Sequence, residues 1–142
     1  MRAFIDSNIF IYALSADSKF GEASEKIIQD IQSGKIDATT TTLNIAEVVE
    51  IIERNADKQK AILSAEALLQ IPMNIESVEK EHAIEATFIF SSSKANFSDT
   101  LFVSVMREKF IETIITNDSD FDSIKGIKVI KPLEYEKKVS KV

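Results

Sequence analysis

The alternation of short apolar segments with longer helical patterns is the feature that most constrains what this chain can fold into. Residues 3–5 form an apolar run, Ala-Phe-Ile, of the kind that occurs in buried strands of parallel sheets. Further short apolar or β-branched segments at residues 37–41, 113–118 and 126–130 are expected strands, and residues 74–78 are expected to be a brief strand or an extended link. Because helical patterns separate these segments, the sequence predicts a three-layer α/β/α sandwich around a central, mainly parallel sheet.

The helical patterns are marked by capping and terminating residues as well as by apolar spacing. Thr42, Asp57 and Ser77 are the expected N-caps of three helices, because their side chains can accept a hydrogen bond from a free backbone N–H. The expected helices cover residues 9–14, 22–32, 43–54, 78–93 and 96–110, with one more between Asp57 and Pro72.

Length and composition fit one domain over residues 1–142. The chain has 142 residues, of which 44% are hydrophobic, which is enough for an ordinary core. No apolar run reaches the ~18 residues of a membrane span, and the start does not have the pattern of a signal peptide. The chain has no cysteine, which excludes disulfides and thiolate metal sites. We therefore expect a cytoplasmic domain that does not enter a membrane.

The net charge of −6 argues against a nucleic-acid partner at first sight, because phosphate binding normally needs a basic surface. Carboxylates that converge on divalent cations would change this conclusion, because the formal count then overstates the negative field at the site. The positions of the acids therefore carry more information than their number.

Two acids follow expected strands. Asp6 comes directly after the apolar run at 3–5, and Asp118 ends the segment at 113–118. Because parallel strands share a carboxyl edge, where open α/β sheets bind their ligands, these two carboxylates are expected on the same side. The structural alternative is that Asp6 and Asn8 turn the chain and cap the next helix.

Two further acids lie in expected helices. Glu47 falls in line with Leu43 one turn before it and Ile51 one turn after it, and a carboxylate left buried and unpaired in an apolar column is costly. Asp99 takes the third helical position if Asn96 is the cap, where a carboxylate also suits the helix dipole. Capping alone would therefore explain Asp99.

Three aspartates with alternate spacing, Asp118, Asp120 and Asp122, resemble the start of an EF-hand loop. That loop needs Gly at its sixth position and Glu at its twelfth, and here those positions hold Ser123 and Val129. A calcium loop is therefore excluded.

The four acids taken together favour a metal site. Two carboxylates from strand ends and two from helices can gather in one cleft, where they cannot all stay ionised without cations. Oxygen-only ligands suit Mg²⁺ or Mn²⁺, and such clusters support metal-assisted hydrolysis of phosphate esters. The sequence therefore predicts a divalent cation held by Asp6, Glu47, Asp99 and Asp118.

In order and spacing, four motifs of this chain resemble the successive acidic motifs of PIN-domain proteins, especially the VapC-like toxins: FIDSNIFIYAL, TTLNIAEVVEII, FSDTLFVSVM and IITNDSDF. The resemblance implies that Asp6, Glu47, Asp99 and Asp118 form a metal-binding active site, with Asn8, Thr116 and Asp120 in support. It also implies a metal-dependent endoribonuclease that acts on RNA, often a homodimer, and silenced by a partner antitoxin. The chain is more acidic and poorer in Arg than many nucleases.

Two other functions are compatible with parts of the sequence. An aspartate-nucleophile phosphatase also places Asp after its first strand, but it needs a second Asp two residues later, where this chain has Asn8. A phosphorylated receiver needs an activating Lys, and Lys131 beside Pro132 is a poor candidate. A non-catalytic module of the same fold that binds RNA or protein stays open.

The remaining distinctive residues have structural interpretations. His82 is expected on a charged surface, and the aromatic residues Phe88, Phe90, Phe97 and Phe102 in the core or at a dimer contact. Lys137, Lys138 and Lys141 are expected in a solvated tail. The apolar helices AILSAEALL and AIEATFIF carry more apolar residues than one face of a small sheet needs, which favours a symmetric homodimer.

Overall fold

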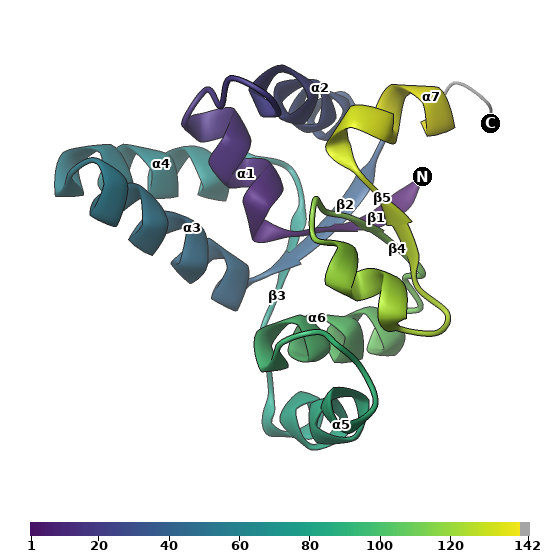
Figure 1. Ribbon diagram of the computed structural model, residues 1–142. Coiled ribbons are helices and arrows are strands. Elements are labelled where there is room, and N and C mark those ends of the chain that lie inside the picture. Colours follow the sequence, from purple (N-terminus) through teal and green to yellow (C-terminus); the bar gives the residue numbers. More distant parts are fainter. Residues whose placement is uncertain (140–142) are drawn as a thin grey trace.

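The computed structural model describes residues 1–139, and its centre is a five-stranded sheet in the order β3-β2-β1-β4-β5 (Figure 1). Every pair of neighbouring strands in this sheet is parallel. The strands are β1 Arg2–Ile5, β2 Asp37–Thr41, β3 Asn74–Glu76, β4 Thr113–Ile115 and β5 Lys128–Ile130. The strand nearest the N-terminus, β1, therefore lies in the middle of the sheet. β2 has the predicted bounds, whereas β3, β4 and β5 are shorter than the segments that predict them.

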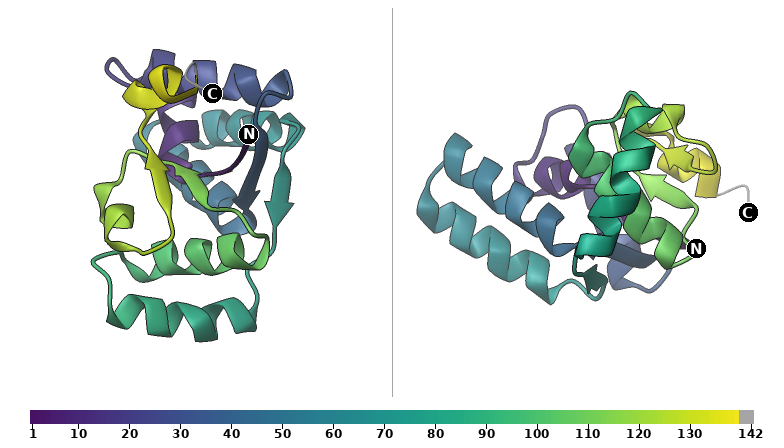
Figure 2. Two further views of the ribbon diagram at one scale, coloured as in Figure 1. Left: turned by 90° about the vertical axis from the view of Figure 1, so that its right-hand side faces the viewer. Right: turned by 90° about the horizontal axis from the view of Figure 1, so that it is seen from below.

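Helices cover both faces of the sheet, as Figure 2 shows most clearly in its left view. They are α1 Ser7–Leu14, α2 Gly21–Gln32, α3 Thr42–Asn55, α4 Lys58–Gln70, α5 Lys80–Ser91, α6 Phe97–Glu108 and α7 Tyr135–Val139. Two 3₁₀ helices, η1 Ser119–Ser123 and η2 Pro132–Glu134, lie on either side of β5 in the chain. The three-layer α/β/α prediction is thus confirmed.

The alternation of side chains along β1 divides the interior into two cores. Ala3 and Ile5 belong to the core beneath α1, α2, α3 and α4, whereas Phe4 belongs to the core beneath α6. The Phe4 ring stacks on Phe102 of α6, with 5.6 Å between the ring centroids. Because both faces of β1 are buried, the strand is apolar at every position between Arg2 and Asp6, as a central parallel strand requires.

Several helix starts differ from the sequence prediction by one or two residues. α1 begins at Ser7 instead of Ile9, because the Asp6 carboxylate accepts a hydrogen bond from the Ser7 N–H at 2.8 Å. The cap of α3 is Thr41, not Thr42, and its hydroxyl accepts from the Asn44 N–H at 3.2 Å. The predicted caps Asp57 and Asn96 are confirmed.

The start of α5 shows why Ser77 was the wrong cap. The His82 imidazole accepts a hydrogen bond from the Glu79 N–H through Nδ1, at 2.8 Å, so the chain enters the helix at Lys80. His82 is buried by this contact and is only 4% exposed, so the prediction of a surface histidine was also wrong. Its Nε2 lies 3.3 Å from Glu108 at the far end of α6.

The segment expected to be a solvated tail is anchored. Tyr135 begins α7, is buried, and donates its hydroxyl to the Asp30 carboxylate of α2 at 2.7 Å. Lys138 forms an ion pair with Glu134 and donates to the Val129 carbonyl at 3.1 Å. Lys141 lies outside the described residues. The prediction missed this contact because the segment is rich in lysine, whereas the buried contact is made by its single aromatic residue, Tyr135.

The aromatic residues divide between core and surface. Phe102 is buried as expected, whereas Phe88, Phe90 and Phe97 face outward, with the rings of Phe90 and Phe97 edge to face at 5.7 Å.

None of the helices in residues 1–139 combines the length and the hydropathy of a membrane-spanning segment.

Candidate functional site

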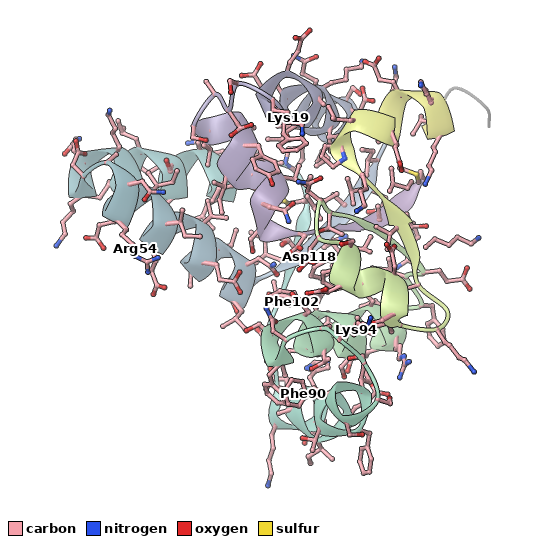
Figure 3. The ribbon with its side chains drawn as sticks, viewed as in Figure 1. Lys19, Arg54, Phe90, Lys94, Phe102 and Asp118 are labelled. Carbon is pink, nitrogen blue, oxygen red and sulfur yellow. The ribbon has the colours of Figure 1, made fainter. Side chains whose placement is uncertain are left out.

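The carboxyl edge of the two central strands carries the acids that follow them. Asp6 comes directly after β1, and Asp118 lies three residues beyond β4. The two strands are neighbours, with Phe4 opposite Ile114 and Ile5 opposite Ile115. The Asp6 N–H extends this pairing by donating to the Ile115 carbonyl at 3.1 Å. Figure 3 shows Asp118 in the middle of the molecule, between the helices of the two faces.

Asp6 is buried and hydrogen-bonded through both carboxylate oxygens. Oδ1 accepts from the Ser7 N–H at 2.8 Å, and Oδ2 accepts from the Thr116 hydroxyl at 2.7 Å and from the Asn8 amide at 3.5 Å. Burial raises the pKa of Asp6, although the hydrogen bonds from Thr116 and Ser7 lower it, and the negative charge of Asp118 adds to the increase. Asp6 is therefore both the cap of α1 and part of a charged cluster, so the two interpretations of the opening sequence are compatible.

The Thr116 hydroxyl joins the two strand ends. It donates to Asp6 and accepts from the Asn8 amide at 3.1 Å and from the Asp118 N–H at 3.0 Å. Asn8 in turn accepts a hydrogen bond from the Asn117 N–H through Oδ1, at 3.2 Å. All the hydrogen-bonding capacity of the Thr116 hydroxyl is thus used to fix the position of Asp6 relative to the loop after β4.

Glu47 reaches the same region from α3 through two residues that sequence reasoning missed. Its Oε2 accepts from the Ser7 hydroxyl at 3.1 Å, and Ser7 accepts from the Asn44 amide at 2.8 Å. Asn44 is held by Thr41, whose hydroxyl donates to its Oδ1 at 2.6 Å. The available signal was the spacing, because Asn44 lies one turn before Glu47 and Ser7 lies directly after Asp6.

The pKa of Glu47 is raised by its partial burial, and the negative charges of Asp6 and Glu50 add to this increase. The hydrogen bond from Ser7 lowers the pKa of Glu47 without reversing the change. Glu47 therefore lies close enough to Asp6 for each carboxylate to make ionisation of the other less favourable.

Asp99, the third residue of α6, is the least satisfied acid. The cap of this helix is Asn96, whose Oδ1 accepts from the Asp99 N–H at 2.9 Å, so the Asp99 carboxylate is not needed as a cap. Its Oδ2 is buried and has no hydrogen-bond partner. Burial, followed by the charges of Asp6 and Asp118, raises the pKa of Asp99 to about 7.

Asp118 and Asp120 belong to the turn that follows β4. Asp118 Oδ1 accepts from the Asp120 N–H at 2.9 Å, which starts η1. The Asp120 side chain is exposed, as is that of Asp122. Asp120 therefore contributes its backbone to the position of Asp118, and the spacing of these acids reflects a 3₁₀ turn.

The four acids are electrically coupled without forming a ready-made metal cage. Among residues 1–139, no three Asp, Glu, His or Cys side chains have the placement of a group that could hold a metal ion. Two observations nevertheless fit a divalent cation: the unpartnered buried oxygen of Asp99, and the raised pKa values of Asp6, Glu47 and Asp99. The donor set is entirely oxygen, which suits Mg²⁺ or Mn²⁺.

Solved structures of the same fold come from toxin–antitoxin systems. VapC20 of Mycobacterium tuberculosis, a toxin that cleaves the sarcin–ricin loop, is similar with a TM-score of 0.71 and 18% identity over 85% of this chain and 93% of its own. A chain of Rickettsia felis VapBC2, solved on a DNA fragment from its promoter, gives 0.72 and 14% over 92% and 98%. A chain of DNA-bound VapBC from Salmonella typhimurium gives 0.70 and 14% over 93% and 99%.

Sequence comparison is consistent with this structural likeness. No curated protein matches the chain significantly. The family model described as "PIN domain" matches residues 3–127, from the first buried residue of β1 to the turn before β5, and so includes all four coupled carboxylates. Since one model spans most of the sheet and the acids at its edge, the chain belongs to the PIN-domain family.

Proposed function

We propose that this protein is a metal-dependent endoribonuclease that hydrolyses phosphodiester bonds of RNA, and that it acts as the toxin of a toxin–antitoxin pair. The observation that carries the proposal is the Asp99 carboxylate, which is buried, lacks a partner for Oδ2, and is coupled to Asp6 and Asp118. An acid in this position is destabilising in the empty site, and a cation is the partner that removes the cost.

In this proposal Asp6, Asp99 and Asp118 bind the cation directly, and Glu47 binds it directly or through a water molecule. A bound Mg²⁺ or Mn²⁺ supplies an activated water and neutralises charge in phosphodiester hydrolysis. Thr116 positions Asp6 through its 2.7 Å hydrogen bond, and Ser7 orients Glu47. Asn8 and the Asp120 N–H keep the loop of Asp118 in place.

A bound cation would also explain how an acidic chain can act on an anionic substrate such as RNA. Without a cation, Asp99 is about half protonated at neutral pH, because burial and the neighbouring carboxylates raise its pKa to about 7. A divalent cation held by Asp6, Asp99 and Asp118 would favour the ionised form of Asp99 and would supply positive charge for a phosphate group. The net charge of −6 therefore does not describe the field that the substrate meets.

The phosphatase alternative receives no support from the geometry. Such an enzyme needs a second acid two residues after the nucleophile, whereas that position holds Asn8, whose amide donates to Asp6 and to Thr116 and cannot shuttle a proton. A non-catalytic binding module is an outcome that the following experiment can identify.

The test is cleavage of a labelled mixed-sequence RNA by the purified protein with Mg²⁺, with Mn²⁺ and with a chelator. We expect cleavage only with a metal, and loss of cleavage in Asp6→Asn. Asp122→Asn is the matched control, because Asp122 is an exposed acid four residues after Asp118. Cleavage that survives chelation or Asp6→Asn contradicts the proposal, and binding of RNA without cleavage identifies the non-catalytic module.

The toxin role is supported by the fold shared with VapC20 and with chains of the VapBC complexes. We expect the product of a neighbouring reading frame to co-purify with the chain and to stop its cleavage of RNA. A neighbouring protein that neither binds nor inhibits the nuclease contradicts the toxin role and leaves the nuclease itself intact.

We also propose a symmetric homodimer through α4. Ile62, Leu63 and Leu69 of this helix are exposed aliphatic side chains, and a hollow of about 470 Å³ beside them is lined by residues of α1, α3 and α4. In a two-fold dimer one such patch faces its own copy. Sedimentation equilibrium at micromolar concentration should show a mass above the 15.9 kDa monomer, and Leu63→Lys should reduce it to the monomer. A wild-type monomer refutes the dimer.

A further inference from the structure

A hollow of about 480 Å³ lies away from the carboxylate cluster, between α5, α6 and the turn after η1. Its polar lining consists of Ser92, Ser93, Ser123, Arg107 and Lys125, and the ring of Phe88 forms part of its wall. The four coupled acids are not among the lining residues. In a chain with a net charge of −6, a hollow bordered by hydroxyls and cations needs an explanation.

Hydrogen bonds fix the walls of the hollow. The Ser123 hydroxyl accepts from the Lys94 N–H at 3.2 Å and donates to the Asp120 carbonyl at 2.7 Å, which joins the α5–α6 loop to η1. The Ser92 hydroxyl is directed to the Ile89 carbonyl at 3.4 Å. Ser93 is different, because its Oγ is buried and has no partner. A hydrogen-bond donor therefore remains unused inside a fixed wall, and such a group is costly unless a ligand accepts from it.

Arg107 and Lys125 line the same hollow as Ser93, and Lys94 follows Ser93 in the chain. Arg107 has one ion pair, a long one of 3.8 Å to Glu85, and both side chains are substantially exposed. Among residues 1–139 no ion pair involves the ammonium of Lys94 or Lys125. Elsewhere in the chain Lys26, Lys109 and Lys128 each pair with an acid. The charges at the hollow are thus available to an anion with several oxygens, such as a phosphate group.

The Phe88 ring adds a second kind of contact. It is 71% exposed beside these cations, although it lies on a helix whose other face is in the core. An exposed ring next to cations is the combination that binds single-stranded nucleic acid, because bases stack on the ring while the backbone meets the charges. A bare inorganic anion would leave this ring without a role.

Chain continuity connects the hollow to the proposed catalytic centre. The loop that carries Ser93 and Lys94 leads into Asn96, the residue that caps α6 and holds the Asp99 N–H. The η1 turn that ends at Ser123 begins directly after Asp118. Both walls of the hollow are therefore extensions of segments that position the acids.

We propose that this hollow binds a phosphodiester of single-stranded RNA outside the scissile bond, with the adjoining base stacked on Phe88. This inference rests on the proposed function for the identity of the nucleic acid, but not for the existence of the site. In it the Ser93 side chain turns its hydroxyl toward a phosphate oxygen, Arg107 and Lys125 supply the neutralising charge from the lining, and Lys94 adds charge from the neighbouring loop.

The test measures binding in a chelated buffer, where no cleavage is expected, by fluorescence anisotropy of a labelled single-stranded RNA. Phe88→Ala should weaken binding about 5-fold or more. Lys125→Ala should also weaken it and should reduce the slope of log K against log salt by roughly 0.7, the value for one phosphate contact on a single strand. Ser93→Ala should weaken binding without changing that slope.

Matched controls separate the hollow from the general surface. Ile84→Ala removes an exposed apolar side chain from the same helix as Phe88, and Lys60→Ala removes an exposed lysine from α4. Neither should change the affinity for RNA. Equal affinity of the hollow variants and the wild type overturns the inference, and so does an effect of Lys125→Ala with none of Phe88→Ala, because an anion site alone needs no ring.

The two proposals fail in different ways. If the hollow variants bind RNA weakly but the wild type never cleaves it with metal, the binding site stands and the nuclease is wrong. If the wild type cleaves RNA with metal and the hollow variants bind normally, the nuclease stands and this site is wrong.

Discussion

Two buried aspartates in this molecule have opposite electrostatic states. Asp30 on α2 is 5% exposed and Asp99 on α6 is 6% exposed, so burial does not distinguish them. Burial raises the pKa of both carboxyls. At Asp30 hydrogen bonds from Tyr135 at 2.7 Å and Lys26 at 3.2 Å outweigh burial and leave the pKa below its usual value. At Asp99 the neighbouring charges are negative, and the pKa rises to about 7.

The difference teaches that the partners of a buried acid, and not its burial, indicate what the acid does. Asp30 accepts a hydrogen bond from the Tyr135 hydroxyl and pairs with the Lys26 ammonium, and the contact with Tyr135 joins α2 to α7. Asp99 has an unpartnered oxygen and three other carboxylates around it. Proteins keep such an arrangement where a ligand arrives to complete it, and functional sites commonly reduce stability in this way.

Activity should separate the two aspartates most strongly. Asp99→Asn should lower the rate of metal-dependent RNA cleavage at least about 100-fold, because it removes a charged ligand from the proposed site. Asp30→Asn should leave the rate per folded molecule within about 2-fold. Initial rates at equal concentrations of folded protein measure both effects, and equal losses in the two variants would remove the functional distinction.

Stability should separate them in the opposite sense. Asp30→Ala leaves the Tyr135 hydroxyl and the Lys26 ammonium without their acceptor, and should lower the free energy of unfolding by about 2–4 kcal/mol. Tyr135→Phe removes one of these hydrogen bonds and should cost about 1–2 kcal/mol. Urea unfolding with a common slope measures both, and a neutral Asp30→Ala would show that α7 is not fastened there.

The pH dependence of stability gives the smallest and most specific effect. Because the pKa of Asp99 is raised in the folded state, the folded protein binds the proton more tightly, and stability falls as pH rises from about 4 to about 7. In metal-free buffer Asp99→Asn should therefore be more stable than the wild type at pH 8 by about 1–3 kcal/mol and equal to it near pH 4.

Asp30 should give the reverse dependence. Its lowered pKa contributes stability above the unfolded value, and that contribution disappears as pH falls through the folded value. The advantage of the wild type over Asp30→Asn should thus decrease toward low pH.

A destabilised Asp99→Asn at pH 8 would contradict the prediction for Asp99. It would mean that the Asp99 carboxylate acts as a helix cap, contrary to the hydrogen bonding of Asn96.

Local patterns predicted the layers and the placement of two acids well. Asp6 and Asp118 each follow an apolar strand segment in the sequence. Because the two strands are parallel, both acids lie at the same edge of the sheet. Glu47 was visible because a carboxylate interrupted an apolar column. The proposed roles of these residues stay predictions until cleavage is measured.

The missed features all depend on partners that are remote in sequence or chemically unusual. Ser7 and Asn44 are ordinary polar residues until α1 and α3 come together and Ser7 bridges to Glu47. His82 resembled a surface residue because its neighbours are charged, and only the Glu79 N–H explains its burial. Tyr135 gained its role from Asp30, 105 positions earlier. No local pattern contains the pairs of Ser7 with Glu47 and of Tyr135 with Asp30.

The central position of β1 has a consequence for the time at which the acids meet. Asp6 is translated before Thr116, the residue that holds it, which follows 110 residues later. At ~5–20 residues per second, synthesis separates the two by roughly 6 to 22 seconds. During that interval the nascent chain has no carboxylate cluster, since Asp99 and Asp118 are still missing or unplaced. If the chain cuts RNA, it therefore cannot do so before Thr116 and Asp118 have been translated and have folded against Asp6.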